Sequence, residues 1–85
     1  MSAPPDDERI AAILRDLALR RGRGKTFCPS EAARALADDW RPLMPQLRRV
    51  AGEMQRRGEL QATRKGAPIE PETAAGPIRL GLPGE

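Results

Sequence analysis

The chain has 85 residues and a formal net charge of +3, with 32% charged, 39% hydrophobic and 2% aromatic residues. A chain of this length buries one small core, so we expect a single domain and no large enzyme with an enclosed cavity. The absence of histidine and the presence of one cysteine exclude zinc fingers, Cys/His catalytic dyads and disulfide frameworks, so we expect no enzyme activity, metal or cofactor.

The first predicted element is a helix over residues 6–20. One face carries four apolar residues at helical spacing: Ile10, Ile13, Leu14 and Leu17. Asp6 or Asp7 is suited to cap its start, and Gly22 supplies its end. Leu19 falls on the opposite face, where we expect it to be half covered.

A very short strand is predicted at residues 25–27, followed by a second helix that begins at Pro29. Proline is favoured at the first position of a helix, and Cys28 then stands at the cap. The apolar side of this helix consists of Ala32, Ala33, Leu36 and Ala37. We expect Trp40 to be a core anchor between this helix and the next.

The third predicted helix spans residues 41–57 and ends at Gly58. Its apolar stripe consists of Leu43, Leu47, Val50, Ala51 and Met54. Pro42 and Pro45 are tolerated because they lie in the first turn or so, where a missing N–H does little harm.

After Gly58 the apolar period changes from 3.6 to 2, which predicts the two strands of a β-hairpin. The apolar positions of the second strand are Ile78, Leu80 and Leu82, and those of the first are Leu60 and Ala62. Residues 66–77 contain three prolines, and we expect this connection to be too long for a tight turn.

The order of these elements predicts an α+β domain over residues 6–82. Three helices, a short strand and a closing hairpin are typical of a winged helix-turn-helix, in which helices two and three form the helix-turn-helix and the hairpin forms the wing. Residues 1–5 and 83–85 lie outside the pattern, and we expect them to be flexible ends.

The net charge is unevenly distributed along the chain. Residues 1–40 are neutral overall, residues 41–65 carry +5, and residues 66–85 carry −2. The basic excess is therefore confined to the third helix and the strand that follows it.

The third helix places its arginines opposite the apolar stripe, with the small residues Pro45 and Gly52 among them. Such a face suits close approach to a nucleic-acid groove, where guanidinium groups reach phosphates and base edges. We predict binding to duplex DNA by Arg41, Gln46, Arg48, Arg49, Arg56, Arg64 and Lys65. The alternative is an ordinary solvated helix face.

The loop over residues 66–77 argues in the other direction, because it carries Glu70 and Glu72 and no basic residue. Phosphates would repel it, although Arg64, Lys65 and Arg79 flank it. Three roles remain open for the loop: a solvated connection, a rigid packing segment or a partner-binding segment. The last of these supports a second hypothesis, a protein-interaction module that uses this loop and exposed apolar residues.

Two local patterns suggest chemistry that the rest of the sequence does not support. Gly24-Lys25-Thr26 matches the end of a phosphate-binding loop, but Leu19 stands where that motif needs glycine and a helix precedes it. Cys28 lacks a histidine base, so we expect it to be a buried structural residue.

Localisation follows from the apolar runs, the longest of which covers five residues, 10–14. That run is too short for a membrane span, and the acidic start is unlike a secretory signal. We therefore expect a cytoplasmic protein without membrane contact.

Three stretches resemble a known family: GKTFCPSEAARAL at residues 24–36, WRPLM at 40–44 and GPIRL at 76–80. The chain is similar, over roughly residues 8–82, to a family of small bacterial proteins classed as a domain of unknown function. The resemblance implies a stand-alone winged-helix-like domain and implies no activity.

Overall fold

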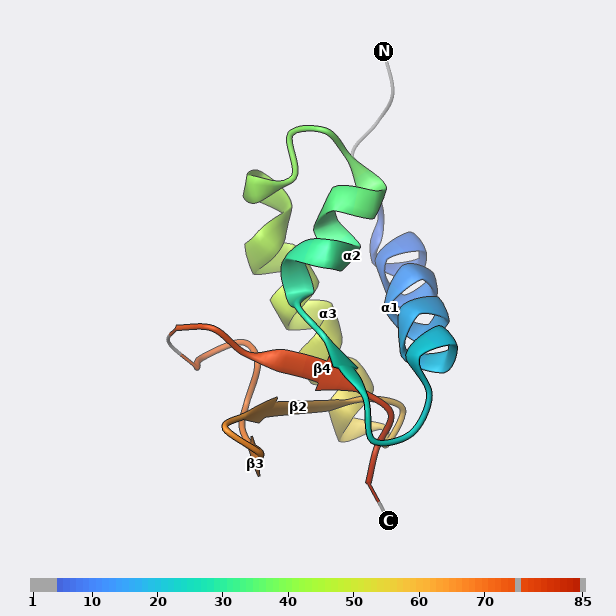
Figure 1. Ribbon diagram of the computed structural model, residues 1–85. Helices are drawn as coiled ribbons and strands as arrows, with labels where there is room; N and C mark the ends of the chain where they lie inside the picture. Colours follow the sequence, from blue (N-terminus) through green and yellow to red (C-terminus); the bar gives the residue numbers. More distant parts are fainter. Residues whose placement is uncertain (1–4, 75, 85) are drawn as a thin grey trace.

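The structure is a computed structural model that describes residues 5–74 and 76–84. These residues form an α+β domain with three α-helices and a small antiparallel sheet (Figure 1). The elements in chain order are α1 (Asp7–Arg21), β1 (Thr26–Phe27), α2 (Pro29–Leu36), the 3₁₀ turn η1 (Arg41–Leu43), α3 (Met44–Arg56), β2 (Gln61–Arg64), β3 (Ala67–Pro68) and β4 (Arg79–Gly81).

The first two helices begin at the predicted caps. The Asp6 side chain accepts a hydrogen bond from Arg9 N at 2.9 Å, which satisfies one of the free N–H groups at the start of α1. Gly22 ends α1 with a positive φ of 85°. α2 begins at Pro29 as predicted, and the backbone N–H of Cys28 donates to Glu31 Oε1 at 3.3 Å.

The third helix differs from its prediction because residues 41–57 do not form one continuous α-helix. Residues 41–43 form a 3₁₀ turn, and α3 begins only at Met44. Pro45 has no N–H to donate to the carbonyl of Arg41, and its ring would clash with that carbonyl in an α-helix. The Arg41 carbonyl instead accepts from Met44 N in a tighter turn.

The four strands lie in the spatial order β1–β4–β2–β3, and every neighbouring pair is antiparallel. The predicted pairing of the first and last strands of the hairpin is confirmed as β2 with β4. The connection between β2 and β4 is long, as expected, but it contains β3, which the sequence did not predict. Lys65 and Gly66, with φ angles of 52° and 83°, connect β2 to β3 in the geometry of a type I′ turn.

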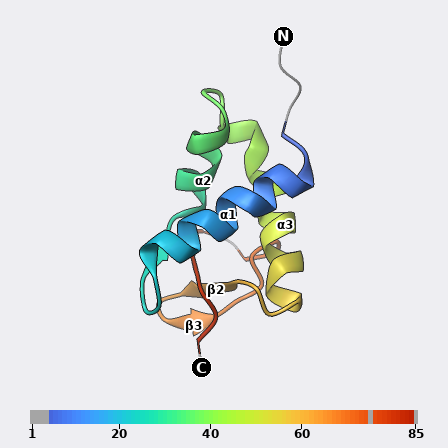
Figure 2. The ribbon, with the colours of Figure 1, turned by 90° about the vertical axis from the view of Figure 1, so that its right-hand side faces the viewer.

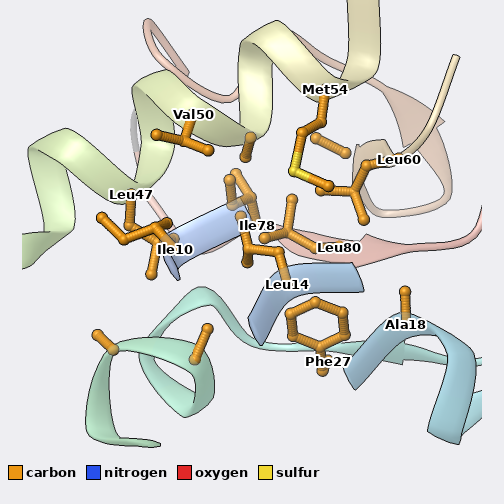
Figure 3. Close-up of a cluster of buried hydrophobic side chains, with 14 residues drawn as sticks. Ile10, Leu14, Ala18, Phe27, Leu47, Val50, Met54, Leu60, Ile78 and Leu80 are labelled. Carbon is orange, nitrogen blue, oxygen red and sulfur yellow. The ribbon is translucent and has the colours of Figure 1, made fainter. Parts of the chain in front are cut away.

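The core lies between the helices and one face of the sheet. Phe27, Leu80 and Ala62 share a row across β1, β4 and β2, and all three are buried. Figure 3 shows Leu14 of α1 and Met54 of α3 beside this row. The predicted stripe of the third helix is buried throughout: Leu43, Leu47, Val50, Ala51 and Met54.

Three side chains are less buried than expected. Leu19 is 62% exposed rather than half covered, because α1 turns only its opposite face toward the core. Trp40 is half-buried and packs against the edge of the core, since it follows α2 in an exposed bend. Cys28 is also half-buried, and its Sγ accepts a hydrogen bond from Ser30 Oγ at 3.2 Å.

The expected flexible ends are only partly within the structure. Residues 1–4 and 85 lie outside the described residues. The carbonyl of Pro5 accepts a hydrogen bond from Gln46 Nε2 at 3.3 Å, and Gly84 N donates to Gln61 Oε1 at 3.1 Å. The chain therefore contacts the domain beyond both predicted limits. Within the described residues, the helices are too short and too polar to cross a membrane.

Candidate nucleic-acid interface

The side of α3 that faces away from the core is covered by residues 69–74, which we call the strap. Gln55 Nε2 donates to the carbonyl of Ile69 at 2.9 Å, and Pro71 is buried. A Cβ built on Gly52 would lie at a contact distance of 3.7 Å from Pro71 Cγ, so the strap rests close against this position of the helix. Residues 69–74 therefore pack against α3, which is one of the three roles that the sequence left open for the loop.

Arg48 is held by three backbone carbonyls of the strap and the residues that follow it. Its Nη1 donates to Ala74 O at 2.8 Å and to Pro71 O at 3.3 Å, and its Nη2 donates to Gly76 O at 3.1 Å. These are charge-assisted hydrogen bonds from both ends of the guanidinium fork. The predicted DNA contact requires the N–H groups of the Arg48 guanidinium, and in this structure they are bonded to the protein's own backbone.

Arg49 and Gln46 are held from the other side, by the start of α1. Arg49 Nη2 donates to Asp7 Oδ1 at 2.7 Å and its Nη1 donates to Glu53 Oε2 at 3.1 Å. Gln46 Nε2 donates to the same Asp7 oxygen at 2.9 Å. The hydrogen bond from Arg49, and after it the one from Gln46, lowers the pKa of Asp7 below its ordinary value of 3.8. The same contact with Asp7 raises the pKa of Arg49.

The two remaining arginines predicted on this side also have partners within the chain. Arg56 Nη1 lies 3.6 Å from Glu70 Oε1 of the strap. The guanidinium of Arg41 lies over the Trp40 ring at 4.6 Å from its centroid, and that of Arg34 lies over it at 4.9 Å. The five residues predicted on the third helix therefore do not form one open surface in this structure.

Arg64 and Lys65, the last two predicted residues, lie together at the tip of the β2–β3 hairpin, and both are exposed. Lys65 occupies a left-handed backbone position that favours glycine or asparagine. The β2–β3 hairpin lies on the far side of the domain from α1 and α2 (Figure 1 and Figure 2).

The hairpin cations continue onto the face of the sheet that points away from the core. Arg79 pairs with Thr63 in the neighbouring strand, one position before the buried Leu80. Its Nε donates to Thr26 Oγ1 and its Nη2 to Thr26 O, both at 3.0 Å, which fixes the guanidinium across β1 and β4. Lys25 directly precedes Thr26 and is exposed.

Two open hollows lie among these residues. The larger is lined by Arg23, Gly24, Lys25, Thr26, Gln61, Thr63, Gly66, Leu82, Pro83 and Gly84, and the other by Arg64, Lys65, Pro77 and Arg79. No described Asp or Glu lines either hollow. We call Arg23, Lys25, Arg64, Lys65 and Arg79 the sheet-side cations.

Most other cations are neutralised by carboxylates. The exposed or half-exposed ion pairs include Arg15 with Glu59, Arg20 with Asp16, Arg21 with Glu31, and Arg57 with Glu59. Such pairs add little stability, but they cancel the local charge. Lys25 and Lys65, by contrast, form no ion pair with any residue that the structure describes. Both lysines of the chain therefore lie on the sheet side without an ion pair among the described residues.

Sequence reasoning missed Arg23 and Lys25 as candidates. The prediction placed Arg79 beside the loop, but it did not bring residues near position 25 to the same place. Their juxtaposition follows from the pairing of β1 with β4, which joins Thr26 to Gly81. The sequence did contain one signal for this surface. Side chains alternate between the two faces of a strand, so Arg79 was expected on the face opposite the apolar Leu80.

These features define a small α+β domain with a cationic sheet side. Residues 7–83 match the family described as Protein of unknown function (DUF3253), and the chain belongs to this family. This match confirms the resemblance to a family of unknown function. Among curated proteins, no sequence matches the chain.

Proposed function

We propose that the protein binds duplex DNA through the sheet-side cations of a winged-helix scaffold. Two features support the scaffold: β1 comes between the first two helices, and the hairpin strands β2 and β4 follow the third and join β1 in the order β1–β4–β2. The observation that carries the proposed function is the gathering of five cations around two hollows that no described carboxylate lines.

The sheet-side cations are suited to phosphates in two ways. Lys25 and Lys65 supply mobile point charges, whereas Arg79 is fixed against Thr26 and presents a planar guanidinium. The β2–β3 hairpin is a two-stranded ribbon, which is narrow enough for the major groove of B-DNA. Contacts to phosphates position a protein without reading sequence, so this surface binds duplexes with little sequence preference.

The α3-side contacts from the sequence lie outside this surface. Arg48, Arg49 and Arg56 face the strap or the start of α1, and Gln46 shares the carboxylate of Asp7. In the conformation described, binding to the sheet side therefore does not require α3 to enter a groove.

A salt titration tests the proposal. Fluorescence anisotropy of a labelled mixed-sequence duplex is measured with increasing protein between about 50 and 200 mM salt. If Lys25, Lys65 and Arg79 each neutralise one phosphate, log K falls with log salt with a slope of about −2.7, or about −0.9 for each contact. The double variant Lys25→Ala/Lys65→Asn should reduce the magnitude of that slope by about 1.8.

A charge-matched control separates the surface from net charge. The double variant Arg20→Ala/Arg57→Ala also removes two positive charges, but from exposed positions outside the sheet side. The proposal expects the control to bind nearly as well as wild type. Equal losses in both double variants, or no duplex binding by wild type, would refute a localised sheet-side interface.

A second candidate function is a protein-interaction module, and the exposure of Leu19 favours it. Ala12 and Asp16 of α1 help to line an open groove between α1 and α2. Leu19 follows Asp16 by three residues and Ala12 by seven on the same helix. Capture of partners from a lysate, with and without nuclease, tests this candidate. It expects partners that survive nuclease and are lost with Leu19→Glu, and it fails if nuclease removes them all.

A further inference from the structure

The strap lies along one stripe of α3. Arg48, Gly52 and Gln55 are spaced by four and three residues, so they follow one another on the same side of the helix. Gln55 donates to the carbonyl of Ile69 at the start of the strap, and Arg48 donates to the carbonyl of Ala74 at its end. Gly52 leaves room for the middle of the strap. The strap therefore covers the side of α3 that points away from the core.

The strap presents oxygen atoms to the α3 guanidinium groups. The carbonyls of Pro71 and Ala74 accept from Arg48, and the carboxylate of Glu70 lies 3.6 Å from Arg56. Carbonyl and carboxylate oxygens are acceptors of the kind that a DNA phosphate offers. The strap thus occupies the same donors that a phosphate backbone would use.

The contacts of the strap are suited to release. Glu70, Glu72 and Thr73 are exposed, whereas Pro71 is buried and Ile69 and Ala74 are half-buried against the core. A hydrogen bond from Ala74 N to Glu70 O at 3.0 Å closes a turn within the strap. Because three of its six residues are exposed, we expect the strap to open at a lower free energy than global unfolding requires.

We propose that the strap is a releasable cover over a second DNA-binding surface, formed by Arg48 and Arg56 of α3. The inference rests on the proposed function, because it takes duplex DNA as the ligand. With the strap in place, the sheet-side cations bind alone. When the strap lifts, Arg48 and Arg56 lose their oxygen partners and become available to phosphates.

Two substitutions of Gly52 separate the covered and uncovered states without removing any charge. In Gly52→Ala, the Cβ would lie 2.9 Å from Glu70 Oε1, the far end of a flexible side chain, and 3.7 Å from Pro71 Cγ. A small movement of the Glu70 carboxylate accommodates it, so the strap stays in place. In Gly52→Leu, the additional carbons require the space of Pro71, so the strap is displaced. Both substitutions raise helix propensity and leave the helix intact.

The experiment measures hydrogen exchange of the backbone amides in residues 69–74 and duplex binding at several salt concentrations. Gly52→Ala should match wild type in both measurements. Gly52→Leu should lose protection in the strap, bind the duplex several-fold more tightly, and steepen the salt slope by about 1.8 for two added phosphate contacts.

The outcomes distinguish this inference from the proposed function. Lost protection in Gly52→Leu without tighter binding or a steeper slope overturns the inference while wild-type binding through the sheet side stands. Binding by Gly52→Leu but not by wild type supports the cover and refutes the sheet-side interface. If neither protein binds, both proposals fail. Retained protection in both Gly52→Leu and Arg48→Ala also overturns the inference, since the strap is then not separable from α3.

Discussion

Arg48 connects α3 to the strap, and its truncation gives a direct measure of how firmly the strap is held. Arg48→Ala removes three hydrogen bonds from a half-buried guanidinium, two of them at 2.8 and 3.1 Å and a longer one at 3.3 Å. The carbonyl partners regain water when the strap loosens, so we count only the two short bonds. At roughly 1 kcal/mol each, the free energy of unfolding should fall by about 2 kcal/mol.

A reduction of this size is easily measured. In a domain of this size each kcal/mol moves Tm by about 4–8 °C, so the expected decrease is roughly 8–16 °C. Urea denaturation followed by circular dichroism gives the same difference at 25 °C. Arg48→Lys keeps the charge, but one ammonium does not span the carbonyls of Ala74 and Gly76 in the way that the guanidinium fork does. It should recover about half of the loss.

Arg56→Ala is the matched control, because it removes an arginine from the same helix whose strap contact is an exposed pair at 3.6 Å. We expect it to cost less than about 0.5 kcal/mol. A loss in Arg48→Ala no larger than that of Arg56→Ala would refute the role of the three carbonyl contacts. Full recovery in Arg48→Lys would show that charge, rather than the fork geometry, holds the strap.

Three further predictions concern other parts of the domain. The depressed pKa of Asp7 means that its contact with Arg49 stabilises the fold fully above the unfolded value near 3.8, and that this stabilisation is lost as pH falls through the lower folded value. The difference in denaturation midpoint between wild type and Asp7→Asn should therefore shrink on acidification. Gly81→Ala should destabilise the protein by roughly 1–3 kcal/mol in thermal denaturation, because its Cβ would lie 2.8 Å from the backbone oxygen of Lys25. Lys65→Asn should stabilise the hairpin by up to about 1 kcal/mol in the same assay, since asparagine tolerates the left-handed position, while weakening duplex binding.

Each of these predictions has an outcome that contradicts it. A constant difference between wild type and Asp7→Asn across the acid range would show that the carboxylate gains nothing from Arg49. Gly84→Ala is the control for Gly81→Ala, because its Cβ would lie 3.4 Å from the side-chain oxygen of Gln61. An equal loss of stability in both variants would show that the close approach of the strands at Gly81 is not the cause. A less stable Lys65→Asn would mean that the turn does not strain lysine.

The sequence predicts the parts of the fold whose causes are local. Asp6, Gly22 and Pro29 act within one turn of their own helices, and each ends or begins a helix where expected. The start of the third helix was misplaced because Pro45 was treated as harmless, although its ring and missing N–H act on the carbonyl of Arg41 four residues earlier. The turn at Lys65 was missed because lysine is not a residue that marks a left-handed position.

The candidate site was harder to predict because its contacts join distant parts of the chain. Arg48 and Pro71 are 23 residues apart, and no periodicity in the loop indicates that this proline is buried. Lys25 directly precedes β1, and it comes to the same side of the domain as Arg79 of β4 because β1 pairs with β4 rather than with β2. A count of charge along the sequence contains neither piece of information.

The distribution of charge in the folded domain differs from its distribution along the sequence. Two of the cations in residues 41–65 lie beside acids from the other two segments, since Arg49 pairs with Asp7 and Arg56 lies near Glu70. Residues 1–40 are neutral overall, yet they contribute Lys25 to the cationic side. Lys65 occupies a backbone position that disfavours it, at the tip of the β2–β3 hairpin. Strained backbone positions are found at functional sites, so in the proposed function the hairpin, rather than α3, is the first surface to contact a phosphate.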